Sequence, residues 1–144
     1  MSPKWLGSLV RARQIQQDAA QLSLANAERL ARARHARVHR EAERLDELGV
    51  PIPPTDVPAF VAAAVALQAA AATHAAARTA AHRADEVSAE RRVVLRDAAI
   101  AANSAEELQD RARAVERAQA ARATQRDLDE VAAGIHRRLS EAGS

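Results

Sequence analysis

The chain has very few of the residue types from which globular domains build a core or a reactive site. It contains no cysteine and no tyrosine, and Trp5 and Phe60 are its only aromatic residues. Without cysteine, a disulfide framework and thiolate chemistry are both excluded. Two aromatic side chains leave little bulk for a wide core, which argues against an ordinary packed domain.

Other patterns are also missing. No apolar run is expected to reach membrane-spanning length, and the stretch from Val57 to Ala72 comes nearest. The first ten residues do not have the pattern of a secretory signal. Lys4 is the only lysine, so the net charge of +2 and the isoelectric point near 10.3 agree, because arginine titrates only at high pH. The charge is therefore mixed. Because the chain has no cysteine, a cytoplasmic environment is expected.

Alanine, by contrast, makes up about a quarter of the chain, together with abundant Arg, Glu and Leu, a balance typical of long helices and coiled coils. The second half has no proline after Pro58 and no glycine before Gly134, which predicts one helix over residues 58–141. Apolar residues recur in it every seven positions, with alanines on the alternating position. The recurring set is Val87, Val94, Ala101, Leu108 and Val115, and the alternating set is Ala98, Ala105 and Ala112.

This spacing of four and three predicts a coiled-coil seam, which needs a partner helix. The first half supplies one over residues 3–48, with Ser2 as a candidate N-cap and Gly49 as a candidate C-cap. Its predicted ladder is Val10, Gln17, Leu24, Ala31, Val38 and Leu45, with Ala20, Ala27 and Leu48 on the complementary positions. Gln17, Arg34 and Glu41 make this seam polar in places.

Residues 49–57 form a proline-rich bend, and Thr55 or Asp56 is expected to cap the second helix. The fold class predicted is all-α: a single coiled-coil domain over residues 1–144, made of two antiparallel helices with the second much longer. The first helix reaches only as far as about Asn103, which leaves the far end of the second helix uncovered.

One alternative fold stays open. Ser104 to Glu107 has the pattern of a capping box, so a break at Asn103–Ser104 would give three helices of similar length. The continuous helix is favoured, because no glycine or proline marks a turn there and the apolar spacing passes through in phase.

No catalytic motif is present, and a two-helix structure offers no pocket that excludes water, so we expect no enzymatic activity, no cofactor and no metal. His35 and His39 share a helical face, but a metal site needs further ligands. The arginine-dense stretch from Arg29 to Arg44 could contact nucleic-acid phosphates, yet acidic residues flank it and no aromatic residue can stack on bases. A solvated face is the favoured interpretation.

Phe60, Ala64, Leu67 and Ala71 share one face at the start of the second helix, by their spacing of four, three and four. Two interpretations remain open. The face packs on the end of the first helix near Leu45 and Leu48, or it is exposed at the tip as a docking site. Both can hold together, because a tip of two helices cannot bury two faces.

Three stretches resemble the flagellar FliJ family, a coiled-coil component of the bacterial flagellar type III export apparatus. The first combines Leu6, Leu9, Val10 and Arg13 with the run from Ala20 to Ala27. The second is the start of the second helix with Phe60. The third runs from Glu107 to Arg111 and from Gln125 to Ala132, and its Leu128, Asp129, Glu130 and Val131 are similar to the family's closing Leu-Asp-Glu-Leu-Ala motif.

The resemblance implies a stalk that sits in the hexameric export ATPase, promotes ring assembly, links the ring to the cytoplasmic domain of the export gate, and handles export chaperones. It implies association with the inner membrane through these partners, at its cytoplasmic face. Gate contact would fall on Phe60, Ala64, Leu67 and Ala71, although Ala64 replaces a larger apolar residue. The residues expected to face the ATPase ring are Leu108, Val115, Leu128, Asp129, Glu130, Val131 and Ile135. The alternatives are a homodimeric coiled-coil scaffold whose free ends pair, and a nucleic-acid-associated helical protein.

Overall fold

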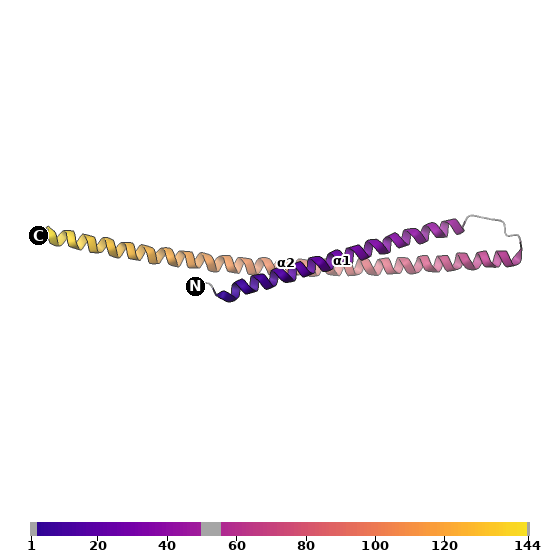
Figure 1. Ribbon diagram of the computed structural model, residues 1–144, viewed down its shortest axis with the longest axis horizontal. Helices are drawn as coiled ribbons and strands as arrows, with labels where there is room; N and C mark the ends of the chain where they lie inside the picture. The colour runs from indigo at the N-terminus through magenta and orange to yellow at the C-terminus, as the bar shows by residue number, and fades with distance from the viewer. Residues whose placement is uncertain (1–2, 50–55, 144) are drawn as a thin grey trace. The chain divides into compact units, whose positions relative to one another are not determined.

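Two helices contain almost all of the residues that the structure describes. The computed structural model describes residues 3–49 and 56–143, with α1 over Lys4–Leu48 and α2 over Val57–Ala142 (Figure 1). The two helices pack against each other, and both sets of bounds lie within one residue of those predicted. Ser2, Thr55 and the prolines of the bend lie outside the described residues.

Local hydrogen bonds account for the helix ends. The Leu6 amide donates to the Pro3 carbonyl at 3.1 Å in the first turn of α1. At the start of α2, Asp56 Oδ1 accepts from the Ala59 amide at 2.8 Å, so Asp56 is the N-cap. Gly49 donates its amide to the Leu45 carbonyl at 3.0 Å without a positive φ. Gly49 therefore ends α1 without the left-handed cap that glycine often provides.

The helix α2 is continuous through Asn103 and Ser104, which contradicts the alternative of three helices. The Ser104 hydroxyl does not cap a helix but donates to the Ile100 carbonyl, one turn back, at 2.9 Å. Thr73, Thr79 and Thr124 bond in the same way to the carbonyl four residues earlier. These internal bonds explain how α2 accommodates hydroxyl residues without breaking.

Each of two compact units takes one part of α1 and one part of α2. The first comprises residues 16–98, and the second comprises residues 1–15 with residues 99–144. In the first unit, Arg92 Nη2 lies 3.5 Å from Glu28 Oε1, and His35 Nε2 lies 2.9 Å from both carboxylate oxygens of Asp85. In the second, Gln14 Nε2 donates to Glu106 Oε1 at 3.1 Å.

Burial along α1 follows the predicted ladder. Val10, Ala20 and Ala31 are buried, and the ladder residues between and after them are half-buried, namely Gln17, Leu24, Ala27, Val38 and Leu45. The polar members Arg34 and Glu41 also lie in this stripe and are half-buried. The prediction is wrong for Leu48, whose side chain is 43% exposed.

The predicted stripe of α2 is only half right. Its alternating alanines, Ala98, Ala105 and Ala112, are buried or half-buried. The row of larger residues is not in the seam, since Val87, Val94, Leu108 and Val115 are 39% to 56% exposed. The row that completes the seam lies one residue later and includes Ala81, Ser88, Leu95 and Ala102.

Side-chain size explains this difference. Alanines and Ser88 occupy the most buried positions of α2, with Ala77, Ala81, Ser88 and Ala102 all at most 3% exposed. Small residues let α1 approach closely, and the larger side chains of α1, such as Leu6 and Val10, fill the seam from the other side. The valines of α2 are consequently left at the edge of the seam, and the hydropathy of single residues misidentified the contact row.

Candidate interaction surfaces

The first candidate surface, here called the tip face, consists of Phe60, Ala64, Leu67 and Ala71. All four are exposed, and Phe60 and Leu67 are 60% and 41% exposed. Every residue from 57 to 69 is exposed, and burial along α2 begins at Ala70. Packing of this face on the end of α1 is therefore contradicted, and the tip face is a surface.

The surroundings of the tip face carry no formal charge. No Asp, Glu, Lys or Arg occurs between Asp56 and Arg78. By length and composition alone, α2 includes one 18-residue window apolar enough to cross a membrane, and 6% of that window is buried. The expectation that no stretch reaches this length was thus wrong, because many consecutive alanines and valines satisfy the criterion even though each alanine is only weakly apolar.

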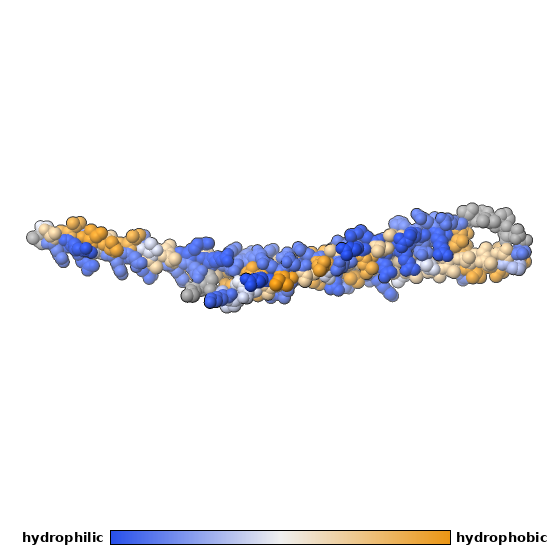
Figure 2. Space-filling view, viewed as in Figure 1, coloured by the Kyte–Doolittle hydropathy of each residue, from blue (hydrophilic) through white to orange (hydrophobic). Residues whose placement is uncertain are grey.

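The second candidate surface is the C-terminal part of α2, residues 117–142, here called the tail. All of its residues are exposed except Gly134, which is half-buried. Its large apolar residues are 50% to 68% exposed, namely Leu128, Val131, Ile135 and Leu139. Figure 2 shows apolar side chains at the surface near this end of the chain. The predicted absence of an intramolecular partner for these residues is confirmed for the described part of the chain.

The residues predicted to face an ATPase ring belong to two different stripes. Leu108 and Val115 flank the row that contacts α1, and they are 47% and 56% exposed. Leu128, Ile135 and Leu139 follow a spacing of seven and four that is out of phase with that row. The tail therefore has its own apolar stripe, and Leu108 and Val115 are not part of it.

The acidic residues of the tail lie around this stripe. Helical geometry puts Asp129 beside the stripe and Glu130 on the opposite side of the helix. The Gln125 amide nitrogen donates to Asp129 Oδ1 at 2.9 Å. Asp129 can therefore flank a docked apolar helix, whereas Glu130 would remain in solvent.

In the first unit, the two sides of the seam differ chemically. One side, here called the polar flank, is formed by the pairs Glu28–Arg92 and His35–Asp85. The sequence interpretation missed these pairs, although their spacing offers a signal. The step from Glu28 to His35 on α1 is seven residues forward, and the step between their partners on α2, from Arg92 to Asp85, is seven residues back. His35 thus contacts a carboxylate on the other helix, and within the described residues no group of three or more His, Cys, Asp or Glu is arranged to hold a metal ion.

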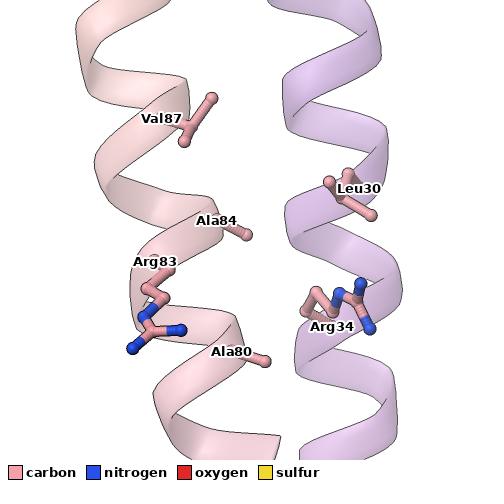
Figure 3. Close-up of a pocket in the computed structure, with 6 residues that line it drawn as sticks. All are labelled: Leu30, Arg34, Ala80, Arg83, Ala84 and Val87. Atoms are coloured by element: carbon pink, nitrogen blue, oxygen red, sulfur yellow. The ribbon is translucent and has the colours of Figure 1, made fainter.

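The other side, here called the apolar flank, is formed by Leu30, Val87 and Val94. Leu30 and Val87 line a shallow groove of about 280 Å³ between the helices, shown in Figure 3. Arg34 from α1 and Arg83 from α2 line the same groove. Neither guanidinium forms an ion pair with any side chain in the described residues.

Four of the arginines between Arg29 and Arg44 share one exposed side of α1, namely Arg29, Arg37, Arg40 and Arg44, which lie within about 80° of one another around the helix axis. Arg34 is half-buried in the seam, whereas Arg32 is exposed on another side of α1. Arg37 lies 4.0 Å from Glu41, its neighbour one turn on. Glu47 lies on the same side of α1, and no aromatic residue there could stack on bases, so a solvated face of mixed charge remains the favoured interpretation.

No protein-family model, no curated protein and no solved structure matches the chain. The resemblance to the FliJ family therefore depends on the sequence stretches named above. The partners and residue roles that it implies remain predictions.

Proposed function

We propose that this protein is a non-enzymatic coupling protein of the flagellar export apparatus, built as an antiparallel two-helix coiled coil. In this role it promotes assembly of the export ATPase hexamer and connects it to the export gate at the cytoplasmic face of the inner membrane. Export chaperones are further partners implied by the resemblance. The protein itself supplies binding surfaces and no chemistry.

The pairings in the first unit support the antiparallel arrangement. From Glu28 to His35 the chain advances along α1, while their partners run backward along α2 from Arg92 to Asp85. Buried and half-buried residues of α1 recur at intervals of three and four over its whole length, which is the periodicity of a coiled-coil seam.

The observation that carries the proposal is the exposed tail. It continues α2 as regular helix over residues 117–142, yet the large apolar residues of the tail are at least 50% exposed. A helix in water is stabilised mainly by packing of its apolar face, so an uncovered stripe of this length favours a partner. A stalk inside a protein ring has such a partner, and Leu128, Val131, Ile135 and the adjacent Asp129 are the residues we assign to it. Glu130, Leu108 and Val115 have weaker support.

The tip face is the surface we assign to the gate. Phe60 is a large exposed aromatic side chain on a helix end without charged neighbours, and exposed aromatic residues of this kind often contribute most to an interface. The small side chains of Ala64 and Ala71 leave room for a partner to approach the backbone closely.

The gate assignment is tested with Phe60→Ala. We expect this change to reduce retention of the chain by the immobilised cytoplasmic domain of the export gate by about tenfold or more, because it removes the one aromatic anchor of the face. Val65→Ala is the matched control, since Val65 is 59% exposed and lies on another side of the same turns. Equal retention of the two variants would exclude the tip face as the gate site.

The ATPase assignment is tested with Leu128→Ser combined with Ile135→Ser. Both side chains are exposed, so the helix content should be unchanged. We expect the variant to lose stimulation of ATPase hexamer assembly, as measured by mass photometry of the ATPase with and without the chain. Val93→Ser, at another exposed valine of α2, should retain it. Full stimulation by the double variant would contradict the assignment.

The exposed tail also fits a second function, a homodimeric scaffold in which two tails pair with each other. Binding of the export ATPase by the wild-type chain distinguishes the two functions, because a scaffold of this kind would not bind it.

A further inference from the structure

The apolar flank leaves space for a third helix beside the two helices that form the seam. Leu30, Val87 and Val94 are 48%, 39% and 49% exposed, and they lie on one side of the seam in the first unit. A groove between two packed helices, lined by apolar residues at seven-residue intervals, has the geometry that accepts a third helix. The polar flank, with its two ion pairs, does not offer this.

The groove also favours a negatively charged occupant. Arg34 and Arg83 line it, and no carboxylate does. Because neither guanidinium is paired within the described residues, a docked helix that carries carboxylates beside its apolar stripe would gain charge-assisted hydrogen bonds. Further along the same side of α2, carboxylates occur at Glu90 and Asp97, beside a third arginine, the exposed Arg91, between Val87 and Val94.

The tail has the complementary features. Leu128 and Ile135 are seven residues apart, as are Val87 and Val94. Asp127 and Asp129 lie on the two sides of this stripe near Leu128.

Charge also gives the docked tail a direction. If the tail runs parallel to α2, Asp127 and Asp129 meet the arginine end of the groove. The same direction carries Arg138 away from Arg34 and Arg83. It brings Arg138 toward the end at which Asp97 lies.

We propose that the apolar flank of one copy of this chain binds the tail of a second copy, as the third helix of a head-to-tail contact. The contact is heterologous, because the groove of one copy meets the tail of the next. It therefore extends into chains of copies as the protein concentration rises. The contact needs no export component and goes beyond the proposed export role, although an ATPase ring that covers the tail would dissolve it.

The test is a complementation experiment on the protein alone. The groove variant carries Val87→Ser and Val94→Ser, and the tail variant carries Leu128→Ser and Ile135→Ser. Sedimentation velocity over about 1 to 500 µM, a range suited to micromolar contacts, would follow association. We expect the wild type to form oligomers that grow with concentration and each variant alone to remain monomeric. The mixture should form a one-to-one dimer that grows no further, because it contains one intact groove and one intact tail per pair.

The charge requirement has its own variants. Arg83→Glu should weaken wild-type self-association by about tenfold or more, the effect typical of a close charge pair, and Asp129→Arg added in the same chain should restore part of it. Val93→Ser, at a valine that is 46% exposed outside the apolar flank, is the matched control and should associate as the wild type does.

Three results would overturn the proposal: a wild type that stays monomeric up to the highest concentration, a single variant that still self-associates, or a mixture that does not dimerise. Circular dichroism of each variant verifies that the helices are intact. Since no ATPase or gate protein is present, failure here leaves the proposed export function untouched, and failure of the ATPase assay leaves this contact untouched.

Discussion

Two regions of the single helix α2 use apolar residues in opposite ways. Between residues 70 and 116, where α2 contacts α1, the most buried side chains are alanines, such as Ala81 at 2% and Ala102 at 1% exposed. In the tail, Leu128, Ile135 and Leu139 form the stripe and are at least 50% exposed. On the α2 side, the contact with α1 is thus made mainly through small residues, whereas most large apolar residues of α2 lie at surfaces without an intramolecular partner.

This difference concerns both stability and function. Alanines contribute little apolar area each, but they permit close helix packing, so the seam depends on shape more than on the size of single residues. In the tail the large side chains are at least 50% exposed, so truncating one of them removes little packing from the described chain. We therefore expect substitutions at the buried positions between 70 and 116 to affect folding and substitutions in the tail to affect binding.

The largest effect is expected for Ala81→Glu. Ala81 is 2% exposed and lies beside Val38, so a glutamate there forces a larger, charged side chain between the closely packed helices, even with Arg78 nearby. The free energy of unfolding should fall by about 3 kcal/mol or more, measured by urea denaturation followed by circular dichroism.

Ala121→Glu is the matched substitution in the tail, where Ala121 is exposed. It should leave the unfolding midpoint close to that of the wild type. Equal destabilisation by the two changes would mean that α2 is covered along both regions, and the comparison would fail.

A smaller effect of opposite sign is expected for Glu41→Leu. The Glu41 side chain is 17% exposed, its Oε2 is buried without a hydrogen-bond partner, and its other oxygen lies 4.0 Å from Arg37. Replacing this poorly satisfied carboxylate by an apolar side chain should stabilise the fold by about 1 kcal/mol. Thermal unfolding measures the gain, and Glu43→Leu at an exposed position should show none.

The smallest effect is expected for His35→Ala. The His35–Asp85 pair is short, but both side chains are 51% exposed, so the pair is well solvated. Its removal should cost less than about 1 kcal/mol. A double-mutant cycle measures the pair. Asp85→Ala should lower the free energy of unfolding less in a chain that already carries His35→Ala than in the wild type. Additive effects of the two changes would show that the pair does not form in solution.

The sequence predicted the buried side of α1 correctly but not that of α2, and the difference has a physical reason. In α1, Val10, Leu24 and Val38 are separated by polar residues, so the periodicity identifies the buried side. In α2, alanine occurs on every side, and an alanine is compatible with both the seam and the surface. The larger valines then determined the predicted row, although the position of α1 decides which row is buried, and that depends on both helices together.

The sequence likewise predicted only some of the candidate surfaces. The uncovered tail could be predicted from the unequal lengths of the helices and from the absence of glycine and proline near Asn103. The exposure of Phe60 could not, because two packings of the tip were compatible with its spacing. The apolar flank was not foreseen either, since Leu30 and Val87 lie far apart in the sequence and meet only when the register of the two helices is known.

The most direct test of the central claim is amide hydrogen exchange of the dilute wild-type chain, with and without the export ATPase. In the free chain, the amides of residues 117–142 should exchange much faster than those of residues 77–105, because few packing contacts hold the tail helix closed. Addition of the ATPase should slow exchange in the tail by at least about tenfold, as expected when binding shifts local opening. Tail amides that are already as protected as the seam in the free protein, or that remain unprotected with the ATPase, would contradict the account.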